Sequence, residues 1–304
     1  MSLPAATLRL DEAVLLNHAW ASALAASHDI RAVIIKGPAL SRQGLRKERV
    51  SADTDMLVEP QKFLEFCELV LAASWHERPS AFIMGQMSPH SRTFVRDGWP
   101  CDLDVHRFFP GFLADAERVF DALWERREYL EFAHQECAVT NRAGSTLILA
   151  LHSLRSTQQQ ARHSSELHQL TSVALSAAER SDVASLALVT GSAATLADVL
   201  ARWGIRVGMT PAEITSPMLK EWREMTDAGG LVLYFWLRAF RHAKPREWPR
   251  LAWRAIWPTD HDLLIARPEI PDAFWPKVRG RIARWRRGLR SLPRAVRAIW
   301  QNRR

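Results

Sequence analysis

The first 140 residues alternate between helical and strand-like patterns of apolar positions. Apolar side chains recur at helical spacing over residues 11–28, which predicts a helix. A short β-branched run at residues 31–35 predicts a buried strand, and Gly37-Pro38 predicts its end and the start of a short helix. A second apolar run begins at residues 56–58, and Pro60 opens a further predicted helix that ends near Ala73.

A hairpin is predicted next. Residues 91–96 (SRTFVR) and 101–106 (CDLDVH) are strand-like, and the four residues between them, DGWP, contain an Asp-Gly turn dipeptide. Residues 136–140 predict one more strand.

After Gly144 the pattern becomes helical. Helices are predicted at residues 147–154, 167–177 and 183–203. We therefore predict an α+β fold in which a mixed α/β half precedes a helical half. The predicted domains are a catalytic domain at 1–142, a helical domain at 143–275 and a basic amphipathic tail at 276–304.

The positive charge of the chain is confined to its C-terminal end. The 304 residues carry a formal net charge of +8, but residues 276–304 contain 11 Lys or Arg and no acidic residue. The remaining residues hold 30 basic and 33 acidic side chains, a net charge of −3. The overall charge is therefore no argument that the body of the protein binds nucleic acid.

Three cysteines, Cys67, Cys101 and Cys137, have no C-x-x-C spacing and suggest reduced thiols. The first residues lack the pattern of a secretory signal, and no uninterrupted apolar run approaches the roughly 18 residues that a spanning helix needs. We expect a cytoplasmic protein, or one held peripherally at a membrane.

Two acidic pairs share the alternation of a strand. Asp53 and Asp55 point the same way if the backbone is extended, and Asp102, Asp104 and His106 share one face of the strand after the Asp-Gly turn. Several carboxylates directed at one point repel one another unless a cation neutralises them. Oxygen ligands favour Mg²⁺ or Mn²⁺. Either Asp102 or Asp104 can be the third carboxylate.

Lys36-Gly37 lies where a predicted strand gives way to a predicted helix. Glycine lets a phosphate approach the backbone, a helix N-terminus offers free N–H groups, and a lysine adds a positive charge. This pair is a candidate phosphate site, although a solvated lysine at a strand end would give the same pattern.

The runs IIKGPAL and RVSADTDMLV, followed by LDVH, resemble an uncharacterised nucleotidyltransferase family of the DNA-polymerase-β-like superfamily. LILALHSLRS is similar to the histidine-bearing helix that often follows the catalytic domain of that family. The resemblance implies a polymerase-β-like core, with a mixed sheet flanked by helices, followed by a helical C-terminal domain.

The resemblance also implies site residues. Asp53 and Asp55 would be the catalytic, metal-binding pair, Asp104 the third catalytic and metal-binding carboxylate, and Lys36 with Gly37 would stand at the nucleotide-phosphate loop.

Arg49, four residues before the first of the paired aspartates, matches the arginine of the family. It would contact the nucleotide, or form a structural ion pair. The wider superfamily has Gly-Gly or Gly-Ser in the phosphate loop, whereas Pro38 follows Gly37 here, so the usual hydroxyl contact to phosphate is absent.

The implied activity is transfer of a nucleoside monophosphate from an NTP, ATP among the candidates, to a hydroxyl or phosphate acceptor, with Mg²⁺ or Mn²⁺ as cofactor. One alternative is a toxin-like enzyme that modifies RNA or protein, so nucleic acid stays among the candidate partners. Another is a non-catalytic scaffold of the same fold that is anchored by its basic tail.

Other histidines fit structural roles. His106 is a candidate general base, a residue that holds a metal ligand in place, or a hydrogen-bonded structural histidine. His152 is expected to be a core histidine on an apolar helix face. His163 and His168 lack the i, i+4 spacing of a helical zinc site.

The tail predicts an amphipathic helix that Pro293 kinks or restarts. Its apolar stripe consists of Val278, Ile282, Trp285, Leu289, Leu292, Val296 and Ile299. Such a stripe packs on the protein itself or on a partner, or binds an anionic membrane surface or another polyanion.

Overall fold

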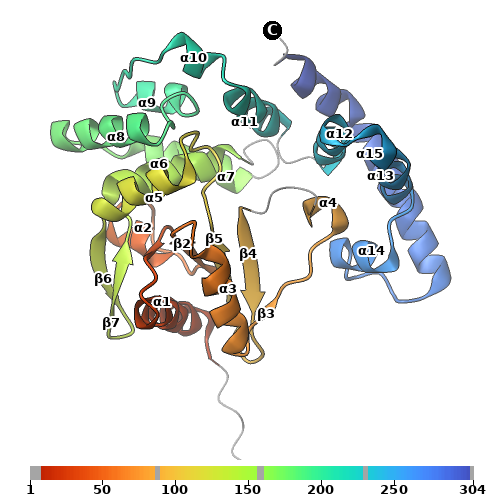
Figure 1. Ribbon diagram of the computed structural model, residues 1–304, viewed down its shortest axis with the longest axis horizontal. Coiled ribbons are helices and arrows are strands. Elements are labelled where there is room, and N and C mark those ends of the chain that lie inside the picture. Colours follow the sequence, from red (N-terminus) through yellow and green to blue (C-terminus); the bar gives the residue numbers. More distant parts are fainter. Residues whose placement is uncertain (1–7, 86–89, 156–160, 229–231, 302–304) are drawn as a thin grey trace, which may run out of the picture. The chain divides into compact units, whose positions relative to one another are not determined.

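The computed structural model describes residues 8–85, 90–155, 161–228 and 232–301, which form two compact units (Figure 1). The first comprises Met1–Arg78 and His90–Trp222, and the second comprises Pro79–Pro89 and Arg223–Arg304. None of the described helices is both long enough and apolar enough to cross a membrane.

The first unit is built around a seven-stranded mixed sheet with the strand order β3-β4-β5-β2-β1-β7-β6. The strands are β1 (Ala32–Ile34), β2 (Asp53–Val58), β3 (His76–Glu77), β4 (Ser91–Val95), β5 (Asp102–His106), β6 (Glu128–Phe132) and β7 (Gln135–Val139). Two neighbouring pairs, β2 with β5 and β1 with β7, are parallel, and the other neighbours are antiparallel.

Helices accompany and follow the sheet. Those of the first unit are α1 (Leu10–Ser27), α2 (Pro38–Arg42), α3 (Phe63–Ala72), α5 (Ala116–Glu125), α6 (Arg142–Leu154), α7 (Ala161–Ser172), α8 (Ala177–Val189), α9 (Ala197–Arg202) and α10 (Pro211–Ile214), and α11 (Pro217–Ala228) runs across the boundary between the units. Helix α6 contacts both α7 and α8.

One face of the sheet packs on α1 and α3 and forms a large apolar core. Met56 and Val58 of β2 belong to this core, as do Leu103 and Val105 of β5. Because side chains alternate along a strand, the aspartates at 53 and 55 in β2 and at 102 and 104 in β5 point to the opposite face. The apolar residues of both strands thus determine where their carboxylates lie.

The second unit is helical. It contains α4 (Phe82–Gly85), α12 (Val232–His242), the 3₁₀ helix η1 (Pro245–Glu247), α13 (Trp248–Ile256), α14 (Asp260–Ala266) and α15 (Phe274–Gln301). Ile83, Trp236 and Leu251 form its apolar centre, and α15 contacts α12 and α14. Helix α15 continues through Pro293, so the predicted restart of the helix does not occur.

The predicted fold class is confirmed: a mixed sheet with flanking helices is followed by a helical region, and the described residues after 142 contain no strand. The predicted hairpin is the antiparallel pair of β4 and β5. Strands β3 and β6 and helix α5 were not predicted.

Two predicted helices are wrong in extent. The helix predicted at 183–203 divides into α8 and α9 around Gly191, which has a φ of +70° and where a Cβ would lie 2.8 Å from the backbone nitrogen of Ala114. The helix predicted at 167–177 ends earlier, because Ser176 caps the N-terminus of α8 together with Glu179.

The compact units end at different residues from the predicted domains. Residue 142 is the first residue of α6, and α6 to α10 belong to the same unit as the sheet. The tail helix α15 belongs to the second unit. The division into functional domains at 142 and 275 stays a prediction.

Candidate functional site

The parallel pairing of β2 and β5 brings two of the predicted carboxylates, Asp55 and Asp104, together. Asp53 lies opposite Asp102, Asp55 lies opposite Asp104, and Leu57 lies opposite His106. Directly opposite residues on neighbouring strands share a face of the sheet. Oxygens of Asp55 and Asp104 and a ring nitrogen of His106 all lie within 4.8 Å of one another, a spacing that could hold a metal ion.

Asp55 is the buried centre of the site. The Lys36 Nζ lies 2.6 Å from Oδ1 of Asp55, and His106 Nε2–H donates to the same oxygen at 2.9 Å. Burial opposes ionisation of Asp55, but the charge of Lys36 and the hydrogen bond from His106 outweigh it, so the pKa of Asp55 falls well below its usual range. Asp55 is therefore ionised at neutral pH.

At Asp53 and Asp104, neighbouring positive charges and hydrogen bonds do not outweigh the cost of burying the charged carboxylate. Burial, and then the charge of Asp55, raise the pKa of both Asp53 and Asp104. Oδ1 of Asp104 is buried and has no hydrogen-bond partner among the described residues. Oxygens that repel one another, one of them unpartnered, are a donor set that fits a divalent cation.

Asp102 and Asp104 differ in their partners. The Nη2 of Arg78 lies 2.5 and 2.6 Å from the two carboxylate oxygens of Asp102. Asp102 is thereby neutralised within the first unit, whereas Asp104 faces Asp55. The geometry favours Asp104 as the third carboxylate.

The loop at Gly37 is tightly constrained. Gly37 has a φ of +72°, and a Cβ there would lie 3.0 Å from Nε2 of the buried His18. His18 is held by the carbonyl of Val14 and the hydroxyl of Thr54, and burial lowers its pKa to about 4. Sequence reasoning missed His18, because nothing in its spacing links α1 to this turn. Helix α2, which begins at Pro38 directly after the Gly37 turn, has only five residues.

Arg49 is partly buried and forms an ion pair with a buried carboxylate. Its Nη2 lies 2.9 Å from Oε1 of Glu166 on α7, and Nη1 of Arg46 lies 3.6 Å from the same oxygen. Arg46 also donates from Nη2 to the carbonyl of Gly37 at 2.8 Å. Arg46 thus links α7 to the turn that carries Lys36. Glu166 and Arg46 had no assigned role in the sequence.

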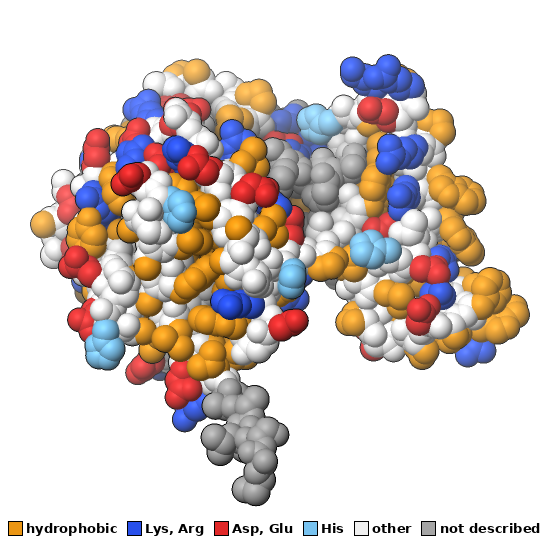
Figure 2. Space-filling view, turned by 60° about the horizontal axis from the view of Figure 1, so that its bottom comes forward, with side chains coloured by type: hydrophobic (Ala, Val, Ile, Leu, Met, Phe, Trp, Pro, Cys, Tyr) orange, Lys and Arg blue, Asp and Glu red, His pale blue; other side chains and the backbone are white. Residues whose placement is uncertain are grey.

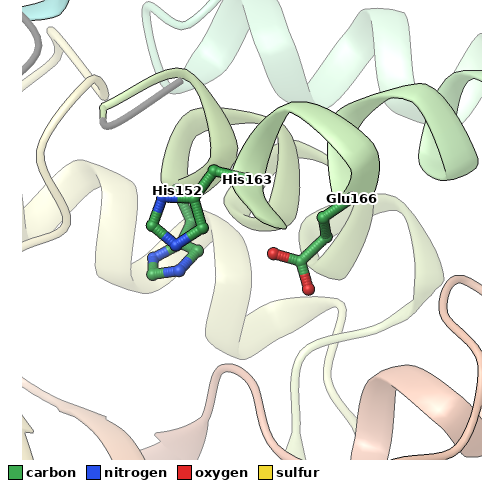
Figure 3. Close-up of side chains that lie close together, drawn as sticks. All are labelled: His152, His163 and Glu166. Atoms are coloured by element: carbon green, nitrogen blue, oxygen red, sulfur yellow. The ribbon is translucent and has the colours of Figure 1, made fainter. Parts of the chain in front are cut away.

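A second cluster lies on α6 and α7. Figure 3 shows the rings of His152 and His163 against one another, with the carboxylate of Glu166 pointing toward them. The ring centroids are 4.8 Å apart, and the three ligand atoms lie within 4.8 Å of one another. Burial lowers the pKa of His152 to about 2 and also lowers that of His163, so both imidazoles are neutral.

His152 and His163 come together from separate helices, so spacing within one helix gave no indication of them. The described candidate metal clusters do not include His168. Neutral imidazoles and a carboxylate can hold a metal ion. The guanidinium groups of Arg46 and Arg49, however, already neutralise Glu166 and oppose a second cation there.

Comparisons with known proteins add little to this geometry. No family model matches the chain, and no curated protein matches it. Among solved structures, it is similar to an antigenic nucleotidyltransferase-like protein from Paracoccidioides brasiliensis, at 12% sequence identity and a TM-score of 0.37. The match covers 69% of this chain and 99% of that chain. A likeness of this degree carries no conclusion about activity.

Proposed function

We propose that the protein is a metal-dependent nucleotidyltransferase of the polymerase-β-like type, which moves a nucleoside monophosphate from an NTP to a hydroxyl or phosphate acceptor. The observation that carries the proposal is the register of Asp55 with Asp104 on parallel neighbouring strands, with Asp53 on the same face. Nucleotidyl transfer depends on positioning and on neutralising charge, and this site offers both.

Asp53, Asp55 and Asp104 would hold the cation, for which Mg²⁺ or Mn²⁺ has the suitable ligand preference. When bound, a divalent cation neutralises the triphosphate and the carboxylates together. The unpartnered Oδ1 of Asp104 and the raised pKa of Asp53 and Asp104 support this assignment.

The chain's own residues have distinct tasks in the proposed reaction. Lys36 supplies positive charge to the phosphates, together with the backbone turn at Gly37, and Arg49 supplies a second positive group. Asp104 accepts the proton of the acceptor hydroxyl. The acceptor oxygen bonds to the α-phosphorus, the bond from that phosphorus to the bridging oxygen breaks, and pyrophosphate leaves.

Titration calorimetry with ATP, GTP, CTP and UTP, each with Mg²⁺ or with EDTA, tests the proposal. The wild type should bind at least one NTP only when Mg²⁺ is present. Asp104→Asn should lose this binding, while Asp102→Asn should retain it, because Asp102 is paired with Arg78. The two variants lie on one strand, two residues apart, and carry the same change of charge. NTP binding that ignores Mg²⁺ and both substitutions would contradict the metal site.

A non-catalytic scaffold is the second candidate function. One observation favours it: Lys36 and His106 both contact Oδ1 of Asp55, so the most buried of the three site carboxylates has counter-groups without any metal. A scaffold would bind no NTP in the same titration. An RNA-modifying enzyme is less favoured, because residues 1–222 carry 22 basic and 26 acidic side chains.

A further inference from the structure

Helix α15 docks on its unit through a cationic face. Arg281 is buried and donates to the carbonyl of Pro258 at 3.1 and 3.2 Å and to Asp260 at 2.6 Å. Lys277 pairs with Asp260 and with Asp272, the latter at 2.8 Å. Arg284 donates to the carbonyl of Ala255. Charged side chains thus anchor the inner side of this helix.

Most of the described part of the apolar stripe predicted from the sequence faces outward instead, whereas Val278 of that stripe is only partly exposed. We define the outer face of α15 as Phe274, Trp275, Ile282, Trp285, Leu289 and Leu292, which are 70%, 69%, 40%, 39%, 70% and 40% exposed. At 100° per residue these six positions fall within about 100° of one another around the helix. Val296 and Ile299 of the predicted stripe lie outside the residues whose side chains the structure describes. An amphipathic helix normally buries such a face.

The end of α13 extends this face. The indole N–H of Trp285 donates to the carbonyl of Ile256 at 2.6 Å, and the Trp285 ring lies 6.3 Å, centroid to centroid, from that of Trp257. Ile256 is 54% exposed. Two adjoining elements therefore expose large apolar side chains.

Positive charge surrounds the outer face. Residues 223–304 contain 19 Lys or Arg and 7 Asp or Glu, a net charge of +12, and Pro79–Pro89 adds no charge. Arg279, Arg286 and Arg290 of α15 are exposed and lie beside the stripe around the helix. Figure 2 shows hydrophobic side chains next to Lys and Arg side chains over the second unit.

We propose that the outer face of α15, together with the end of α13, docks on an anionic lipid bilayer surface. The helix would lie in the plane of the headgroups, with its tryptophans and leucines at the acyl boundary and its arginines at the lipid phosphates. Indole rings and long arginine side chains suit this boundary because each is apolar along its body and polar at one end.

A bilayer fits this surface better than other polyanions or a second copy of the chain. Nucleic acid would satisfy the arginines, but its phosphates would leave the aliphatic side chains of Ile282, Leu289 and Leu292 without a partner. A second copy would set one strongly basic unit against another, which like-charge repulsion opposes. Only a surface that is both apolar and negatively charged complements both parts of the face.

Cosedimentation of the full chain with vesicles tests the proposal. Vesicles of phosphatidylcholine mixed with phosphatidylglycerol are compared with pure phosphatidylcholine, at low and at high salt. The wild type should bind the anionic vesicles at low salt, bind neutral vesicles far more weakly, and lose affinity as salt rises. Leu289→Glu should weaken binding by about tenfold or more, because it places a charge in the apolar stripe.

Leu64→Glu is the matched control. Leu64, on α3 of the first unit, is 67% exposed, almost as much as Leu289, and the two substitutions change the charge equally. The control should bind vesicles as the wild type does, and both variants should keep the wild-type melting temperature. Three results would overturn the proposal: no binding of the wild type to anionic vesicles, equal binding by Leu289→Glu, or a wild-type dimer in sedimentation analysis that Leu289→Glu dissociates.

Discussion

The ammonium group of Lys36 lies 2.6 Å from Oδ1 of Asp55, and the two side chains are only 13% and 2% exposed. The pair joins the end of β1 to β2 at the centre of the carboxylate site. Removing one member of a buried ion pair leaves the other as an unpaired buried charge. The stability of the protein should therefore depend on Lys36 and respond to a cation that replaces it.

Lys36→Met should lower the free energy of unfolding by about 3 kcal/mol in EDTA. Added Mg²⁺ should then raise the melting temperature more in the variant than in the wild type, since the metal supplies the missing positive charge. Urea and thermal unfolding measure the two effects. The affinity for NTP should also fall.

Lys62→Met is the control for this variant. Lys62 pairs with Glu65 at the same 2.6 Å, but both side chains are more than two-fifths exposed. Exposed pairs contribute little to stability, so this variant should unfold as the wild type does. Equal effects of the two substitutions would contradict a special role for the Lys36 pair.

Asp53→Asn should stabilise the metal-free protein at neutral pH. Burial and the charge of Asp55 raise the pKa of Asp53, so ionised Asp53 costs free energy in the folded state. Lowering the pH through that raised pKa restores the lost stability in the wild type, and restores it fully below the pKa of the unfolded chain. The advantage of the variant should therefore shrink as the pH falls.

Unfolding in urea at a series of pH values, with EDTA present, measures this advantage. Asp102→Asn should show no such gain, because Asp102 is paired with Arg78. Activity at the wild-type rate in Asp53→Asn would contradict the metal assignment, whatever the stability.

Gly37→Ala should be more destabilising than Gly44→Ala. Both glycines have a positive φ, +72° and +68°, so both substitutions carry a similar backbone strain of about 1 kcal/mol. A Cβ at Gly37 would also lie 3.0 Å from the ring nitrogen of His18, whereas nothing lies within 4 Å at Gly44. Equal losses of stability in thermal unfolding would show that the His18 ring moves aside and does not constrain the turn.

Strand β5 could be predicted because apolar residues alternate with its aspartates, and β2 because an apolar run at residues 56–58 follows its two aspartates. Asp53 and Asp55 share a face in β2, as do Asp102 and Asp104 in β5. The sequence could not decide between Asp102 and Asp104, since that choice depends on Arg78, 24 residues away along the chain. Periodicity describes one element at a time and carries no information about such a partner.

The same limit explains the other omissions. The six residues of the outer face of α15 were in part predicted as one stripe, but not the direction in which it points. That direction is determined by Arg281 and Lys277, which find carbonyl and carboxylate partners on preceding segments. His152 and Glu166 meet only through the packing of α6 on α7.

Glu166→Gln should separate the two roles considered for Arg49. The carboxylate of Glu166 holds Arg49 at 2.9 Å and is buried. Its loss should lower the free energy of unfolding by about 3 kcal/mol, because Arg46 and Arg49 lose their buried counter-charge. If Arg49 binds phosphate, NTP affinity should rise severalfold, since Glu166 no longer competes for it. Unchanged affinity would leave Arg49 as a structural ion pair.

Glu179→Gln is the control for that variant in both calorimetry and unfolding. Glu179 pairs with Arg142 at 2.5 Å but is more exposed than Glu166. This substitution should leave NTP affinity unchanged and affect stability less.

Arg281→Ala and Arg279→Ala should separate the inner from the outer side of α15. Arg281 is buried and donates twice to the carbonyl of Pro258, so its removal should lower the stability of the second unit by about 2 kcal/mol. Arg279 is exposed two residues away, and its removal should leave the melting temperature unchanged while weakening vesicle binding at low salt. Thermal unfolding and cosedimentation of both variants measure the two effects. Loss of stability in Arg279→Ala, with none in Arg281→Ala, would show that the helix docks through its apolar stripe and would remove the outer face as a membrane surface.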